Sequence, residues 1–283
     1  MSIFQSIILG IIQGLTEFVP ISSSGHLVLV RDILGWPDSG LGFDVILHLG
    51  TLLAILIYFK KEWIRLIKSF FLAVYSIAKP KAADSYKKED RNLIIMIIIA
   101  TIPAGLVGLI FGGVLDFMFR SIPWVVSFLF ITAFLMIGAE MKRGKKYNTY
   151  QKHRSIKEIS FRDAAAIGIA QALAVLPGIS RSGTTISAGI FRGLKRSSAA
   201  KFSFLLSAPI ILGAGLVNIC NIVKGEQFNG NWYLFFFGFV FSFIFGFLSI
   251  KYMISYLKTK SLRLFVYYLI GLGVVLLVFN YLR

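Results

Sequence analysis

The sequence predicts an all-α integral membrane protein, with six full transmembrane helices and two re-entrant broken helix pairs related as an inverted-topology repeat. Three observations lead to this fold class. Of the 283 residues, 57% are apolar and only 15% are charged, whereas a soluble domain has about 25% charged residues. Most of the basic residues gather in a few segments that long apolar runs separate. In addition, two short stretches far apart in the chain resemble each other.

The net charge of +17, from 30 Lys and Arg against 13 Asp and Glu, indicates membrane topology and argues against nucleic acid as a partner. Twenty-five of the 30 basic residues lie in four segments, with nine in 60–92, eight in 141–162, four in 192–201 and four in 251–263. Loops rich in Lys and Arg usually face the cytoplasm. We therefore expect these four segments to lie in the cytoplasm.

Six apolar runs are close to the ~20 residues that a helix needs to cross the hydrocarbon layer. They cover residues 43–59, 93–115, 122–140, 203–223, 232–250 and 262–282. Two further regions, 3–35 and 163–191, each hold an apolar run, a break rich in Pro, Ser and Gly, and a second short apolar run. Neither half is long enough to cross alone. The parity of the spans then predicts that the first pair enters from outside, with both termini, and the second from the cytoplasm.

A gapless alignment relates the two breaks. Residues 10–26 align with residues 168–184 at an offset of 158, and eight of the 17 positions are identical. Random pairing would give roughly one or two identities at ordinary residue frequencies, so we interpret the similarity as a duplication. In inverted repeats of this kind, broken helices meet near the midplane and their half-helix N-termini direct partial positive charge at an anion.

The duplication also predicts how the chain is organised. We expect a single polytopic membrane domain over residues 1–283 that consists of two repeats. Its parts would be a first repeat over about 1–140, a basic cytoplasmic linker over 141–162 and a second repeat over about 160–283.

Each break carries serine and glycine residues immediately before its second half-helix. Free N–H groups and hydroxyls at a helix start can bind phosphate oxygens. The candidate substrate-binding residues are Ser22, Ser24 and Gly25 in the first break and Ser180, Ser182, Gly183, Thr184 and Thr185 in the second. The alternative is that each serine only caps its half-helix or forms the turn.

Arg181 lies inside the second break, between two apolar half-helices. Burying its guanidinium in a membrane costs at least ~2.5 kcal/mol, so we expect an anionic partner. A phosphate of the substrate, held by two N–H groups, is one candidate. The alternative is a structural ion pair with Glu17.

Gln13 and Glu17 are four residues apart and therefore share one helix face just before the first break. The carboxylate of Glu17 can hold a divalent cation, Mg²⁺ or Ca²⁺, that bridges phosphate oxygens. The alternative is that Glu17 pairs with Arg181 alone. Gln13 is a further substrate-binding candidate.

His26 directly follows the first break and lies close in sequence to Ser22 and Ser23. Histidine titrates near neutrality and can act as a base, an acid or a phosphate acceptor. We predict a functional role for His26, the alternative being a structural one. His48 lies within an apolar span with no motif nearby, so we predict that it is a packing residue.

The segments QGLTEFVPISSSGH (13–26) and PGISRSGTT (177–185) closely resemble the two signatures of the bacitracin-resistance type of undecaprenyl-diphosphate phosphatase. The resemblance extends over the whole chain in length and span pattern, and it includes KFSFLLSAPIILGAG (201–215). It implies a multi-pass enzyme of the bacterial inner (plasma) membrane. The implied reaction is hydrolysis of undecaprenyl diphosphate to undecaprenyl phosphate, which recycles the lipid carrier of cell-wall synthesis.

The resemblance also implies roles for individual residues. The first signature of the family has Glu or Gln, three residues and then Glu, and this chain has the Gln variant at Gln13, with Glu17 intact. A metal site of two carboxylates is therefore in doubt. The implied roles are catalytic serine and histidine for Ser23 and His26, phosphate binding for Arg181, and further polar site positions for Ser180 and Thr185.

We predict that Ser23 attacks the phosphate with His26 as its base, in a cavity that opens to the outer (periplasmic or extracellular) face. A phosphohistidine at His26 and direct attack by water are the alternatives. A secondary transporter or a flippase of a lipid phosphate is the competing function, because broken helices in inverted repeats are usual in transporters. The prenyl tail of the substrate would stay in the bilayer, and a homodimer is compatible with the sequence.

Overall fold

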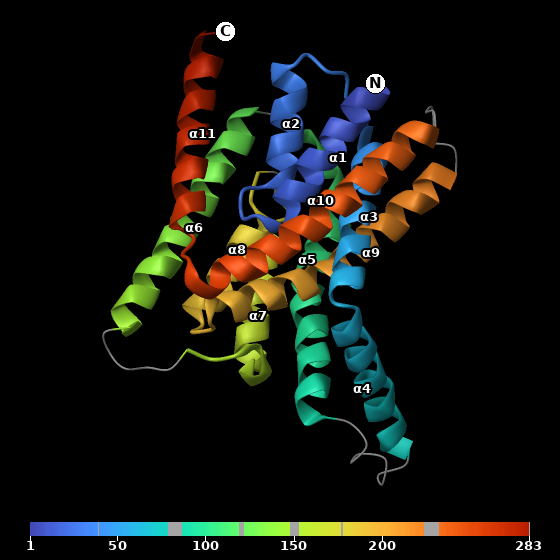
Figure 1. Ribbon diagram of the computed structural model, residues 1–283, viewed down its shortest axis with the longest axis vertical. Coiled ribbons are helices and arrows are strands. Elements are labelled where there is room, and N and C mark those ends of the chain that lie inside the picture. Colours follow the sequence, from blue (N-terminus) through green and yellow to red (C-terminus); the bar gives the residue numbers. More distant parts are fainter. Residues whose placement is uncertain are drawn as a thin grey trace.

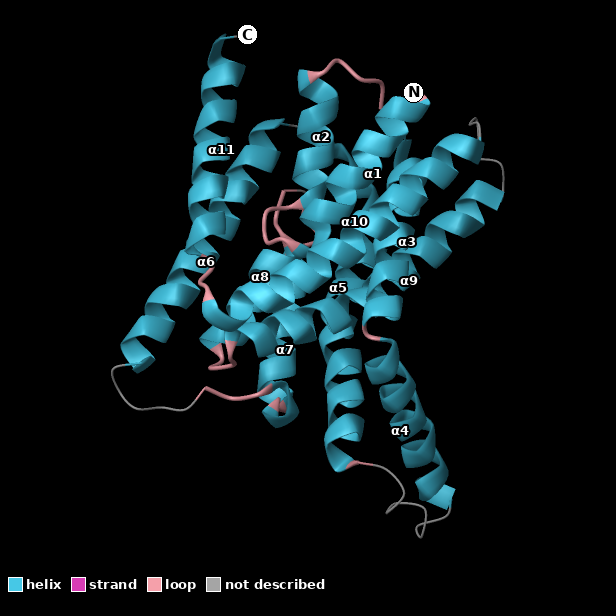
Figure 2. Ribbon diagram, in the orientation of Figure 1, coloured by secondary structure: helices cyan, strands magenta, loops and turns pink. Residues whose placement is uncertain are grey.

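The computed structural model describes residues 1–38, 40–78, 87–118, 122–147, 153–176, 178–223 and 232–282. These residues are helical nearly throughout (Figure 2), and a single bridge between Arg154 and Leu194 is the only β-pairing that they contain. The elements are α1 (Ile3–Phe18), α2 (Ser23–Ile33), α3 (Gly40–Tyr58), α4 (Lys60–Ala78), α5 (Lys88–Met118), α6 (Ile122–Tyr147), η2 (Ile156–Glu158), α7 (Phe161–Leu173), α8 (Arg181–Phe191), α9 (Arg196–Val223), α10 (Trp232–Thr259) and α11 (Arg263–Leu282).

The two broken pairs, α1–α2 and α7–α8, are both present. In Figure 1, α1 starts at the end of the molecule where both chain ends lie, and α2 returns to that end. The α7–α8 pair starts at the opposite end and returns there, so the two breaks meet in the middle of the molecule (Figure 1). Pro177, which belongs to the predicted second break, lies outside the described residues.

Each broken pair packs tightly against a long helix of the other half of the chain, and a glycine makes this approach possible. A Cβ atom on Gly10 of α1 would lie 2.6 Å from the carbonyl oxygen of Gly238 on α10. At the aligned position in α7, a Cβ on Gly168 would lie 2.8 Å from the carbonyl oxygen of Ala100 on α5. Small residues allow backbones in membrane helices to approach closely, so these glycines fix where each break lies.

All six predicted spans form helices, but fewer than six are long and apolar enough to cross a membrane by themselves. Among the described residues, four stretches meet that requirement, Lys88–Phe111, Pro123–Gly144, Arg196–Val217 and Trp232–Thr259. A fifth arises if α3 and α4, which meet at 81°, count as one broken span. Over Arg263–Val278, α11 is apolar but shorter. The fold is thus a multi-pass helical membrane protein with four to five crossing candidates.

Two segments predicted as cytoplasmic loops are partly helical, which corrects the prediction. Residues 60–78 of the basic segment 60–92 form α4, because its apolar residues are spaced on one face and Leu66 is fully buried. In the predicted linker 141–162, α6 continues to Tyr147 and α7 begins at Phe161. Residues 79–86 and 148–152 of these segments lie outside the described residues.

Candidate active site

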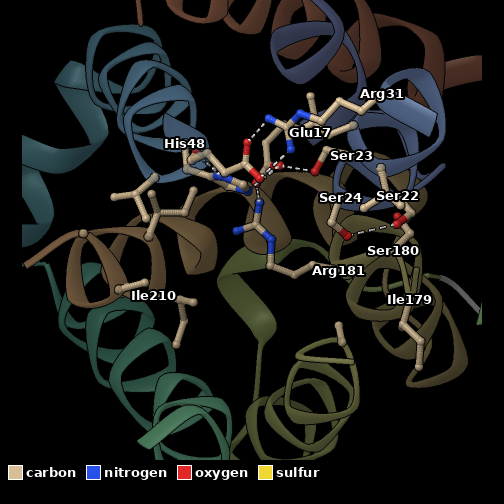
Figure 3. A pocket seen from close by; sticks show the side chains of 18 of the residues that line it. Glu17, Ser22, Ser23, Ser24, Arg31, His48, Ile179, Ser180, Arg181 and Ile210 are labelled. Atoms are coloured by element: carbon tan, nitrogen blue, oxygen red, sulfur yellow. Dashed lines mark hydrogen bonds and ion pairs between the residues drawn. The ribbon is translucent and has the colours of Figure 1, made fainter. Parts of the chain in front are cut away.

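A cavity of about 670 Å³ lies where the two breaks meet, with α3 and α9 as its other walls (Figure 3). Its polar lining includes residues from α1, α2, α3 and α8 and their flanks, namely Glu17, Ser22, Ser23, Ser24, His48, Ser180 and Arg181. Its apolar wall includes Ile210, Ile211 and Ala214 of α9. The cavity continues along α2 to Arg31, Asp32, Trp36 and Asp38, toward the end of the molecule where both chain ends lie.

Glu17 is the centre of this site. Its Oε1 accepts a hydrogen bond from Nη2 of Arg181 at 2.5 Å, and its Oε2 accepts one from Oγ of Ser23 at 2.6 Å and one from Nε2 of Gln13 at 2.9 Å. Glu17 is only 6% exposed. A buried carboxylate needs such partners, because it has lost its hydration. One side chain therefore joins the first break to the second.

The guanidinium of Arg181 is only partly used by this ion pair. Its Nη1 is buried and has no hydrogen-bond partner among the described residues. Figure 3 shows the side chain extending from α8 across the cavity toward Glu17. A guanidinium has five donors in a planar fork, so a donor remains for an anion that enters beside Glu17.

Ser22 and Ser23 owe their positions to the start of α2. The side chain of Ser22 caps the helix, because its Oγ accepts a hydrogen bond from the N–H of Gly25 at 3.3 Å. Its backbone has φ 68° and ψ 96°, and no other described residue apart from glycine has a positive φ. Ser24 Oγ lies 3.4 Å from Ser22 Oγ. The first break thus presents three serines and the start of a helix to the cavity.

The second break is built in the same way around Ser180. Its Oγ accepts a hydrogen bond from the N–H of Gly183 at 3.1 Å and lies 3.2 Å from Oγ of Ser182. The backbone N–H of Ser180 donates to Thr132 of α6 at 3.1 Å. From this break, Ser180 and Arg181 reach the cavity.

Seven of the predicted catalytic or substrate-binding residues do not line the cavity, namely Gln13, Gly25, His26, Ser182, Gly183, Thr184 and Thr185. Their hydrogen bonds are internal. Ser182 donates to the carbonyl of Val19 at 3.1 Å, and Thr185 lies 2.6 Å from the hydroxyl of Ser203. The four residues 182–185 follow the cap Ser180 by two to five positions, where the turn of α8 directs side chains into the protein. The geometry therefore makes these four residues part of the scaffold of the site.

The predicted pair of Ser23 and His26 is not formed. Ser23 donates to Glu17, and both ring nitrogens of His26 have other partners. Its Nδ1 lies 2.7 Å from the carbonyl oxygen of Ser22, and its Nε2 lies 2.7 Å from the hydroxyl of Tyr268 on α11. The physical reason is the helix start itself, because the ring turns back over the cap carbonyl four residues earlier instead of toward the hydroxyl of Ser23.

His48 lines the cavity, so the prediction that it only packs was wrong. Its Nδ1 lies 2.7 Å from the carbonyl oxygen of Asp44, and its Nε2 is 3.7 Å from Oε2 of Glu17 (Figure 3). A carbonyl can only accept, so Nδ1 carries the hydrogen in this bond. The sequence held a signal for this placement, since Asp44 and His48 are four residues apart and share a helix face.

A divalent cation at Glu17 would find few protein ligands. The described residues contain no group of three or more His, Cys, Asp or Glu that could hold a metal ion. Gln13 offers one further oxygen, since its amide nitrogen already contacts Glu17. Its Oε1 is buried and has no hydrogen-bond partner among the described residues. The donor set therefore fits a cation that takes most of its ligands from a bound phosphate, as Mg²⁺ often does.

The comparisons with known proteins concern the chain as a whole. The family described as "Bacitracin resistance protein BacA" matches residues 6–275. Proteins named undecaprenyl-diphosphatase are 41% identical in Thermodesulfovibrio yellowstonii, over 99% of this chain and 98% of that protein, and 40% identical in Methanosphaera stadtmanae, over 99% of both. A third, from Caldicellulosiruptor bescii, is 41% identical over 100% of this chain and 99% of its own length. The chain therefore belongs to the BacA family of bacitracin resistance proteins.

Proposed function

We propose that the protein is a membrane-embedded phosphatase that hydrolyses undecaprenyl diphosphate to undecaprenyl phosphate and inorganic phosphate, and so recycles the lipid carrier for cell-wall synthesis. One observation carries this proposal. The hydroxyl of Ser23 lies 2.6 Å from a buried carboxylate, and the other oxygen of that carboxylate holds a guanidinium from the opposite break. A nucleophile, its base and a phosphate-binding cation are thus within one cavity. The family and the names of its relatives support the same reaction.

In the reaction that this geometry supports, the terminal phosphate binds to Arg181 and to the N–H groups at the starts of α2 and α8. Oγ of Ser23 attacks the terminal phosphorus, and Glu17 takes the hydroxyl proton. The bond from phosphorus to the bridging oxygen breaks, and undecaprenyl phosphate leaves. The departing phosphate oxygen takes the proton from Glu17, which is then ionised again. Water attacks the phosphoserine and gives a proton to Glu17, and Glu17 passes this proton to Oγ of Ser23 as the bond from phosphorus to Oγ breaks and inorganic phosphate departs. Arg181 offsets the charge that builds on the phosphoryl oxygens.

A divalent cation, Mg²⁺ or Ca²⁺, is part of the proposal. Glu17 and the buried oxygen of Gln13 would hold it together with oxygens of the diphosphate. When bound, such an ion offsets the negative charge of the diphosphate. Removing metal with a chelator should then lower activity, and adding Mg²⁺ or Ca²⁺ should restore it.

We also propose six membrane crossings and an inverted repeat, with the cavity open to the outer face. The equivalent glycines Gly10 and Gly168 support this, since α1 packs on α10 of the second half and α7 packs on α5 of the first. The cavity extends along α2 toward the end of the molecule opposite the basic helix ends, and basic ends usually face the cytoplasm.

Cysteine labelling tests the orientation. In a Cys220→Ser background, cysteines introduced at Asp38, which lines the cavity mouth, and at Lys157, which is exposed in the basic linker, should label from opposite faces of intact cells. Labelling of both from the same face would refute the proposed topology.

The decisive test of the reaction uses detergent-purified protein and a prenyl diphosphate, with no gradient present. We expect release of inorganic phosphate, which a transporter or flippase would not produce. Ser23→Ala should abolish it, whereas Ser24→Ala is the matched control, because Ser24 lines the same cavity without bonding to Glu17. No phosphate release from the intact protein would refute the proposed function.

A further inference from the structure

The two halves of the site share a contact that the alignment makes visible. Four residues after each capping serine, a side chain donates to the backbone carbonyl of that serine. In the first break, Nδ1 of His26 lies 2.7 Å from the carbonyl oxygen of Ser22. In the second, Oγ1 of Thr184 donates to the carbonyl oxygen of Ser180 at 2.9 Å. His26 and Thr184 are aligned at the offset of 158, so the same contact is made by a histidine and by a threonine.

Both nitrogens of His26 are committed to fixed partners. The carbonyl of Ser22 can only accept, so Nδ1 carries a hydrogen. In the neutral ring, Nε2 then accepts from the hydroxyl of Tyr268 at 2.7 Å, and the two rings are stacked with centroids 5.7 Å apart and planes inclined by 12°. The residue is absent from the lining of the described cavity. Its ring therefore has no free lone pair to offer to Ser23.

The bond from His26 acts on a strained part of the backbone. Ser22 has φ 68°, a left-handed conformation that costs free energy in any residue other than glycine. Such a conformation persists only where surrounding contacts hold it. The carbonyl of Ser22 belongs to the peptide group that leads into Ser23, so the direction of that carbonyl sets where the side chain of Ser23 starts.

We propose that His26 is a positioning residue and neither the nucleophile nor the base of the reaction. Its Nδ1 hydrogen holds the carbonyl of Ser22, the strained Ser22–Ser23 peptide then presents Oγ of Ser23 to Glu17, and Tyr268 fixes the tautomer of the ring. The inference rests on the proposed function to the extent that Ser23 is the attacking group.

Substitutions that keep one ring nitrogen at a time separate these roles. The amide nitrogen of asparagine can occupy the place of Nδ1, and that of glutamine the place of Nε2. We expect His26→Asn to keep kcat within about tenfold of the unmodified protein, with an unchanged pH profile and KM. His26→Gln and His26→Ala should lose about 100-fold in kcat with little change in KM. Tyr268→Phe, which removes the hydroxyl and keeps the ring, should lose only a few-fold.

Thermal unfolding and gel filtration of each variant show whether it is folded. If His26→Ala does not fold, the comparison of His26→Asn with His26→Gln still decides the matter. Two results would overturn the inference. One is a folded His26→Asn protein as inactive as His26→Gln, and the other is an acid-labile, base-stable phosphoryl adduct that His26→Ala lacks. Absence of phosphate release from the unmodified protein would instead refute the proposed function, so the two failures are distinct.

Discussion

Ser22 in the first break has a φ of 68°, whereas the aligned Ser180 in the second has an ordinary φ of −72°. Both serines cap a half-helix, and both accept a hydrogen bond from the residue four positions later. The shared contacts give the two breaks a common arrangement, which is a pair of helix starts facing one cavity. The two serines differ in backbone strain. The strained one, Ser22, directly precedes Ser23, whose hydroxyl donates to the carboxylate of Glu17.

The two breaks differ at two aligned positions, and each break has a charged residue at one of them. Glu17 aligns with Val175, and Ser23 aligns with Arg181. The first break therefore supplies a carboxylate and the second a guanidinium, and the ion pair between Glu17 and Arg181 joins the two breaks. The two breaks thus share their helix caps, whereas the proposed chemistry depends on the positions at which their residues differ. Substitutions at aligned positions should therefore have unequal effects.

The largest inequality is expected at Glu17 and Val175. Glu17→Gln should lower kcat about 10³-fold, because the amide can take no proton from Ser23 and cannot balance Arg181. Val175→Ala, at the aligned position, should leave kcat within about twofold, since Val175 does not line the cavity. Steady-state phosphate release measures both. If Val175→Ala lowered kcat as much as Glu17→Gln does, both breaks would contribute to catalysis at this aligned position.

Arg181→Lys should lower kcat about 100-fold even though the charge is kept. A lysine offers a point charge, whereas a guanidinium can hold Glu17 and a phosphate oxygen at the same time. Arg192→Lys is a matched control, because Arg192 pairs with Asp163 outside the cavity. Phosphate release under saturating substrate measures the effect. Near-normal turnover in Arg181→Lys would reduce this residue to a general positive charge.

Gln13 and Gln171 provide the next comparison, because the alignment preserves both. Gln13 donates to Glu17 at 2.9 Å, whereas Gln171 donates to the carbonyl of Ala100 at 3.3 Å. Gln13→Ala should lower kcat about tenfold through the loss of one contact to the carboxylate. Gln171→Ala should leave kcat unchanged and lower stability by about 1 kcal/mol. The expected contrast fails if Gln171→Ala impairs turnover as much as Gln13→Ala at equal stability.

The smallest effect is expected at Thr184. Thr184→Val removes the hydroxyl that bonds to Ser180 and should lower kcat only about twofold, because Ser180 is unstrained and needs little support. Thr184→Ser keeps the hydroxyl and should behave as the unmodified protein does. A loss in Thr184→Val as large as that in His26→Ala would show that both breaks depend equally on this contact, and that strain at Ser22 is not the reason.

The sequence was informative about Glu17 and Arg181 because each is a charged residue next to apolar half-helices in a membrane protein, where a charge needs a specific reason. Ser23 was predicted from its match to the family signature. For His48 the signal was weak, because apart from its four-residue spacing from Asp44 a histidine in the middle of a span looks the same whether it packs or lines a cavity. The orientation of His26 depends on Tyr268, which lies 242 positions away. The segment that forms α4 was predicted as a loop because it carries many charged residues. Its apolar face becomes clear only from the packing of the folded protein, in which Leu66 is buried.

The bond between Glu17 and Arg181 makes the carboxylate an internal ligand of the guanidinium. A phosphate that enters the cavity has to share Arg181 with a partner that is already in place and cannot diffuse away. Binding of substrate and of inorganic phosphate is weakened to the same degree, because the competitor acts on both. Uniform weakening of this kind leaves the barrier from bound substrate to the transition state unaltered while it speeds the departure of product. In a lipid cycle, each carrier molecule has to be released for its next use. A guanidinium that is already paired with Glu17 therefore favours release of the product over its retention in the site.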